Sequence, residues 1–206
     1  PAIGGKLRGD RNVQREQGLF EIAGNIIRDA SQFGILVEAG DRDPVTGFSH
    51  PGAVINFETT NDERLAPGAV IQNNIVSRSG VAGIRFGGES SNGAGVPAAA
   101  VPLGKIINNT IVGNTVVGGA AFGVGIQVVD NSRPTILNNI ISETATGITV
   151  DATSTAVVER THFYRNANNG VAGQNAISVA RTATSPPPLF IDASTDNYYL
   201  KLGALA

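Results

Sequence analysis

A short phrase recurs along the chain. Residues 71–88 read IQNNIVSRSGVAGIRFGG, residues 106–114 read IINNTIVGN and residues 136–150 read ILNNIISETATGITV. Four copies align on an Asn that has Ile three positions before it and two β-branched residues after it; these anchors are Asn25, Asn74, Asn109 and Asn139. One copy is too short to bury its own apolar face, so the copies must stack and share a continuous core.

Each copy continues with a second signature, Gly-Ile-x-apolar, at residues 34–37, 83–86, 125–128 and 147–150. A degraded fifth copy contains Val158, Thr161 and Phe163, and we assign Ala176-Ile177-x-Val179 as its version of this second signature. Between later copies lie only VDNSRPT and DATSTAV, which leave room for a turn and a short third strand. The smallest coil is therefore three short strands and three turns, about 22 residues, a length that predicts a parallel β-helix with a right-handed course.

Composition agrees with an all-β solenoid of about five coils. The chain of 206 residues holds 26 Gly, and no segment shows a sustained helical period. Cys is absent, which excludes disulfides and thiolate metal sites. A net charge of −2 without basic clusters disfavours a nucleic-acid partner, and no apolar run approaches the roughly 20 residues of a membrane span. We therefore expect neither nucleic-acid binding nor membrane insertion.

The repeated Asn residues have a structural interpretation. Stacked strands lie about 4.8 Å apart, so like residues of successive coils sit above one another. We expect Asn25, Asn74, Asn109 and Asn139 to form a ladder of side-chain amides at a turn, where Asn also tolerates a left-handed backbone. His162 precedes the core-like Phe163 and should point outward, toward solvent.

These columns resemble the parallel β-helix repeats of pectate-lyase-like proteins. The ending PPPLFIDASTDNYYLKLGALA (residues 186–206) is similar to a terminal phrase of that class, and residues 16–40 resemble segments of very large secreted or surface-anchored bacterial proteins. The resemblance implies one β-helix domain over residues 1–206, extracellular or on the cell surface, and part of a longer polypeptide. Residues 1–18 would cap it or continue an upstream coil. Residues 186–206 would cap the last coil through Leu189, Phe190, Tyr198, Tyr199 and Leu200.

Chemistry is expected in two long insertions that follow the same strand of successive coils, residues 38–70 and 87–105, and that should project side by side. The first insertion could bind a ligand through Asp41, Asp43, His50, Asp62 and Glu63. A lyase would need carboxylates to hold Ca²⁺, with Asp41 and Asp43 as the calcium candidates. It would also need a cationic base, for which Arg42, Arg64 and Lys105 are the candidates. The alternative is that these charges are solvated turn residues.

Two functional readings follow, with a third from geometry alone. The first is a non-catalytic module of a larger extracellular protein, a rigid scaffold for surface adhesion, glycan contact or assembly, without a resident cofactor. Its partners would be the rest of the polypeptide, neighbouring copies through the coil ends, or a polysaccharide. The second is a polysaccharide lyase or epimerase acting on an acidic glycan at the 38–70 loop. We find no carboxylate or base in the strand columns of adjacent coils, which disfavours an enzyme. The third is a filament-forming subunit that stacks through its coil ends.

Overall fold

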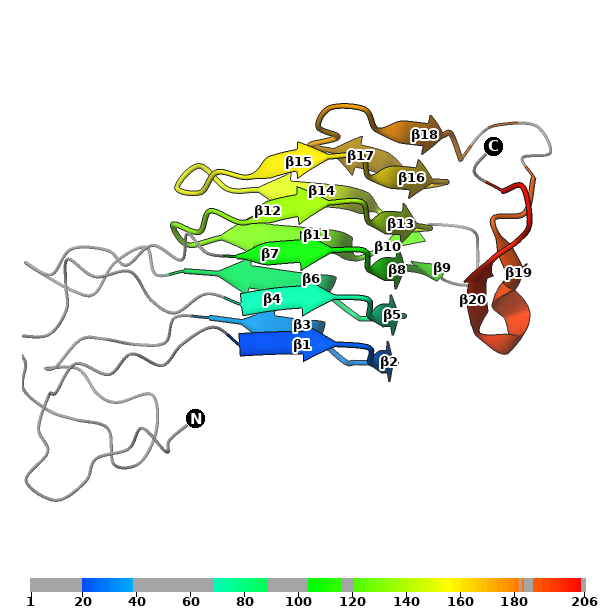
Figure 1. The fold of residues 1–206 in the computed structure, drawn as a ribbon, viewed down its shortest axis with the longest axis horizontal. Helices are drawn as coiled ribbons and strands as arrows, with labels where there is room; N and C mark the ends of the chain where they lie inside the picture. The colour runs from blue at the N-terminus through cyan, green and yellow to red at the C-terminus, as the bar shows by residue number, and fades with distance from the viewer. Residues whose placement is uncertain are drawn as a thin grey trace, which may run out of the picture.

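The computed structural model describes residues 20–38, 69–88, 104–115, 121–181, 183 and 187–204. These residues build a stack of coils in which every turn of the chain adds one strand to each of three parallel sheets (Figure 1). The described part of the chain contains no helix that is long and apolar enough to cross a membrane.

The first sheet contains β1 (Phe20–Ala23), β4 (Ala69–Gln72), β7 (Lys105–Ile107), β12 (Thr135–Leu137) and β15 (Val157–Glu159). The second contains β2 (Ile26–Arg28), β5 (Ile75–Ser77), β8 (Thr110–Val112), β13 (Ile140–Ser142), β16 (His162–Tyr164) and β18 (Ile177–Val179). The third contains β3 (Phe33–Val37), β6 (Ala82–Gly87), β11 (Val124–Val129), β14 (Thr146–Val150) and β17 (Asn168–Gly170). A short antiparallel pair, β9 (Asn114–Thr115) and β10 (Ala121–Phe122), decorates the third coil.

Like residues stack on like residues, as the repeat predicts. In the first sheet Ile22, Ile71, Ile106 and Ile136 occupy one register column, and Val158 continues it. The third sheet contributes a second column of isoleucines, residues 35, 84, 126 and 148. Apart from Ile22, the members of both columns are buried and belong to one core cluster. Because β-branched side chains pack well on a pleated surface, this core also favours the strand conformation that creates it.

The assignment of the last coil from sequence is wrong in one strand. Ile177 pairs with His162, so β18 belongs to the second sheet and starts a sixth, partial coil. The third-sheet position of the fifth coil is filled by β17, in which Gly170 pairs with Ile148. Asn169 stands where the earlier copies have Gly, so the Gly-Ile signature is missing from this strand. The five predicted coils are present, with part of another beyond them.

The C-terminal segment lies along the side of the stack rather than over its end (Figure 1). It forms a hairpin of β19 (Phe190–Asp192) and β20 (Asn197–Leu200), joined by a 3₁₀ turn at Ala193–Thr195. Leu189, Phe190 and Tyr198 form a small cluster with Val112 and Tyr164 of the second sheet. Ile75, Ile140 and Val179 of the same sheet pack against this cluster, so the hairpin buries nonpolar surface contributed by several coils. Tyr199, expected in the cap, is 67% exposed.

Candidate functional site

The paired Asn residues between the first and second sheets have two separate roles. The first of each pair, Asn73, Asn108 and Asn138, has a left-handed backbone with φ of 55–56° and an exposed side chain. Asn is among the few residues that adopt this conformation at low cost. The second of each pair has its side chain directed into the turn, where it is 1% exposed.

The buried Asn residues form a continuous ladder. The side-chain Nδ2 of Asn74 donates to Oδ1 of Asn109 at 3.0 Å, and Nδ2 of Asn109 donates to Oδ1 of Asn139 at 3.0 Å. Asn25 extends the ladder to the first coil with a 2.9 Å bond to Asn74. Each inner amide also reaches a backbone carbonyl of the previous coil, as Asn109 does at Ile71. These amides are occupied by the fold and are not free to bind a ligand.

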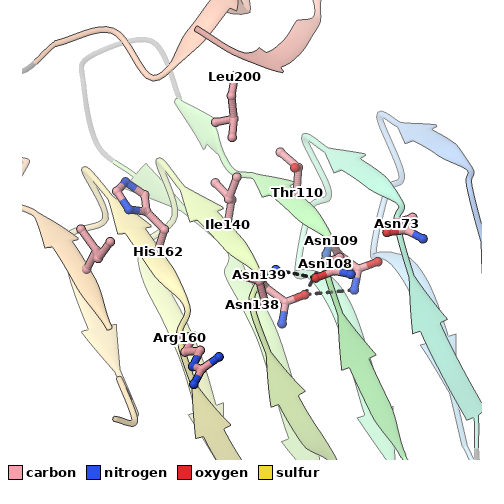
Figure 2. Close-up of a pocket in the computed structure, with 11 residues that line it drawn as sticks. Asn73, Asn108, Asn109, Thr110, Asn138, Asn139, Ile140, Arg160, His162 and Leu200 are labelled. Atoms are coloured by element: carbon pink, nitrogen blue, oxygen red, sulfur yellow. Dashed lines mark hydrogen bonds between the residues drawn. The ribbon is translucent and has the colours of Figure 1, made fainter. Parts of the chain in front are cut away.

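The exposed Asn residues line a groove of about 360 Å³, and Asn109 and Asn139 of the ladder form part of its lining (Figure 2). Ile140 and Ile177 of the second sheet also line the groove, and Leu200 of the C-terminal hairpin borders it. Among the described residues that line it, Arg160 is the cation and His162 the imidazole. We call this the asparagine groove. It combines amide, apolar and cationic surface, the mixture expected of a ligand site.

His162 departs from the expectation that it is exposed. Its side chain points outward from the stack, but only 6% of the residue is accessible. The imidazole stacks with Tyr164, with ring centroids 6.4 Å apart. Neither ring nitrogen has a hydrogen-bond partner among the described residues. Burial lowers the pKa of His162 below its ordinary value, which keeps the ring neutral.

Arg160 takes the place in the turn that Asn138 has one coil earlier, and it too is left-handed, with φ of 48°. Its side chain is exposed and lines the groove. No other described residue forms an ion pair or a side-chain hydrogen bond with its guanidinium. An Arg in this conformation carries backbone strain that Asn or Gly would avoid.

A charged cluster fastens the C-terminal hairpin that borders the groove. Arg78 donates from Nε to Asp29 at 2.6 Å, and its guanidinium also binds Asp196 of the hairpin and the hydroxyl of Tyr198. Arg28 lies 3.6 Å from Asp196 on the same side. These contacts lower the pKa of Asp29 and Asp196, in both of which the hydrogen bond from Arg78 is the largest cause.

A second polar cluster lies on the outer face of the third sheet, where the two long insertions leave it. Arg85 hydrogen-bonds Gln127 at 3.0 Å and forms ion pairs with Asp130 at 3.2 Å and Glu38 at 3.6 Å. The guanidinium also lies over the Phe33 ring, 5.4 Å from its centroid. Arg85 occupies the variable position of Gly83-Ile84-x-Phe86, so one strand of the third sheet carries a cation that the search for a base in the strand columns passed over. Its outward direction follows from strand alternation and could have been read from the sequence.

The insertions begin and end on neighbouring strands. Val37 pairs with Phe86 where they leave the third sheet, and Val70 pairs with Lys105 where they join the first. Lys105 is exposed at the start of β7. The other sequence-predicted candidates, Asp41, Arg42, Asp43, His50, Asp62, Glu63 and Arg64, lie outside the described residues. Within the described ranges, no group of three or more His, Asp or Glu side chains could hold a metal ion.

Sequence reasoning did not find the asparagine groove. The tandem Asn pairs are visible in the sequence, but the groove also needs the C-terminal hairpin, which lies beside the turns that contain them. Leu200 of that hairpin is separated from Asn73 by more than half of the chain. No short stretch of sequence predicts a contact between segments so far apart.

Comparison with known proteins agrees with this architecture. A family model described as a right-handed beta helix region matches residues 12–182. No curated protein and no solved structure shows a significant match. The match covers most of the chain and the described strands have the stacking it requires; the protein belongs to the right-handed β-helix family.

Proposed function

We propose that this chain is a non-catalytic β-solenoid scaffold of a larger extracellular protein, which presents polar surface to a glycan or to another surface partner. The observation that carries the proposal is the unbroken register of the coils. Ile, Val and Asn columns tie successive turns together, so the surface on each side of the stack is held on a stiff frame.

Stiffness matters because a scaffold must hold its binding segments in place without ordering them at the moment of contact. Surface loops carry function when a rigid framework positions them. The two insertions leave and rejoin neighbouring strands, so their four ends are held by paired backbone. The paired strands that hold these ends are already ordered, so the frame itself loses little conformational entropy when a partner binds.

The contacts of Arg85 favour a scaffold over a lyase. It is the cation at the centre of the third sheet's outer face, and it is held by Asp130, Glu38 and Gln127. A base that abstracts a proton must meet the substrate, whereas the Arg85 guanidinium is engaged by these three side chains and by the face of the Phe33 ring. In this arrangement Arg85 joins the strand ends of adjacent coils.

The test is to incubate the 206-residue chain with uronic-acid polymers and Ca²⁺ while following the ultraviolet absorbance of unsaturated products. We expect retention of the chain on at least one immobilised glycan without product formation. A rise in absorbance that Arg85→Gln abolishes would contradict the proposal and favour a lyase. Arg133→Gln is the matched control, because it removes an exposed Arg from a different turn.

A further inference from the structure

We propose that the asparagine groove binds an extended oligosaccharide that bears a carboxylate, with the sugar chain parallel to the helix axis and the acidic group at Arg160. The inference rests on the proposed function, because it names a glycan class and places it on the scaffold. The groove lies beside the turns between the first and second sheets, whereas the ends of the long insertions lie where the third sheet stops and the first begins.

The wall of the groove presents one exposed carboxamide from each of three successive coils, those of Asn73, Asn108 and Asn138. Asn138 Nδ2 donates to Asn108 Oδ1 at 2.6 Å, and this is the bond that joins two members of the row. No described residue bonds the side chain of Asn73 or the Nδ2 of Asn108. A carboxamide has two donor hydrogens and an acceptor oxygen. The row thus repeats donors and acceptors at about the 4.8 Å strand spacing, which suits a polymer that carries hydroxyl groups on every unit.

The apolar lining suits a sugar ring as well. Ile177 is 51% exposed and Leu200 is 39% exposed, and both lie along the groove with Ile140. A pyranose ring has polar edges and faces of C–H groups, so it can place hydroxyls against amides and C–H groups against aliphatic side chains. Binding sites commonly pair apolar surface with a few orienting polar groups.

The Arg160 end selects an anion. A guanidinium binds a carboxylate through two parallel hydrogen bonds, and no other described residue occupies that of Arg160. His162 lies in the same lining with a ring that has no described hydrogen-bond partner. Buried polar groups nearly always have such a partner. A ligand hydroxyl at this end would supply it.

The experiment measures binding of the whole chain to alginate and polygalacturonate, to their carboxyl-reduced forms, and to polyglutamate. Arg160→Gln keeps a long side chain on the left-handed backbone but removes the charge. Asn108→Gly combined with Asn138→Gly removes two amides while Gly accepts their positive φ. Arg133→Gln is the control, since it deletes an exposed cation outside the groove. Thermal unfolding shows whether each variant remains folded.

We expect at least one uronic-acid polymer to bind more tightly than its reduced form. Arg160→Gln should weaken that binding by about tenfold or more, and the double Gly variant by several-fold. Arg133→Gln should bind as the unaltered chain does. The inference is overturned if no uronic-acid polymer binds, if Arg160→Gln and Arg133→Gln behave alike, or if polyglutamate binds equally well, since charge alone would then explain retention. Product release with intact groove dependence would overturn only the non-catalytic proposal.

Discussion

Replacement of Asn109 by Ala tests whether the amide ladder stabilises the stack. The Asn109 side chain is 1% exposed and makes five hydrogen bonds. Its Oδ1 accepts from the backbone N–H and Nδ2 of Asn74, and its Nδ2 donates to Ile71 O, Ile107 O and Asn139 Oδ1. Its backbone φ is not left-handed, so Ala adds no strain there.

The expected loss follows from what remains after truncation. Asn74 Nδ2 keeps its bond to Ile22 O, and Asn139 Oδ1 keeps the backbone N–H of residue 109. The backbone N–H of Asn74, however, loses the side-chain acceptor that it has in the ladder. A neutral hydrogen bond contributes about 1 kcal/mol net, and an orphaned buried donor costs about 1–3 kcal/mol. With part of the ladder re-satisfied, we expect a loss of about 3–5 kcal/mol in the free energy of unfolding.

The matched control is Asn25→Ala at the end of the same ladder. Asn25 is exposed and its side chain makes two hydrogen bonds, to Ala23 O and to Asn74 Oδ1. Its loss should cost about 1 kcal/mol, because water can replace the amide. Urea unfolding followed by circular dichroism measures both values, and hydrogen exchange at the Asn74 amide reports the local effect.

A second substitution separates the amide's chemistry from its volume. Asn109→Asp has nearly the same size but directs an oxygen at the Ile71 and Ile107 carbonyls, where the amide donates. It should be at least as destabilising as Ala near neutral pH and recover part of the loss in acid, when the carboxyl gains a proton. The reasoning fails if Asn109→Ala and Asn25→Ala cost the same, or if Asp is tolerated like Asn.

Three further outcomes are expected. Arg78→Gln should accelerate hydrogen exchange in residues 190–200, and acid should do the same. Hydrogen bonds from Arg78 lower the pKa of Asp196, so their stabilisation is full above the ordinary Asp pKa and is lost as pH falls through the lowered value. Unchanged hydrogen exchange would contradict this role of Arg78. Burial lowers the pKa of His162, so stability should fall as pH drops below its ordinary pKa of 6.5. His162→Ile should flatten that slope in urea midpoints, and an equal slope in both proteins would refute the assignment. Gly125→Ala places a new Cβ 2.5 Å from Gly147 O and should cost about 1–3 kcal/mol in thermal unfolding, whereas an unchanged melting temperature would show that the coils can separate.

The sequence predicted the stack because its signals are local and repeated. Ile71 and Ile106 stand at the same offset from Asn74 and Asn109, and in-register pairing is what that offset requires. The Gly of each Gly-Ile signature follows from the same stacking, since a Cβ on Gly125 would meet the next coil. The prediction of strand positions fails where the repeated sequence is no longer kept. Asn169 replaces that Gly in the fifth coil, and Ile177 was therefore placed in the wrong sheet.

The tertiary structure alone decided what covers the stack. A strand pattern states which residues point outward, but it does not state which outward faces meet water. Tyr164 points outward and is nonetheless buried, because Leu189, Phe190 and Tyr198 of the C-terminal segment pack against it. That docking depends on the summed apolar area of several coils and on ion pairs such as Arg78 with Asp196, which no short window contains. The sequence by itself determined the coil and its columns; the position of the hairpin, and with it the asparagine groove, was decided by packing between segments more than a hundred residues apart.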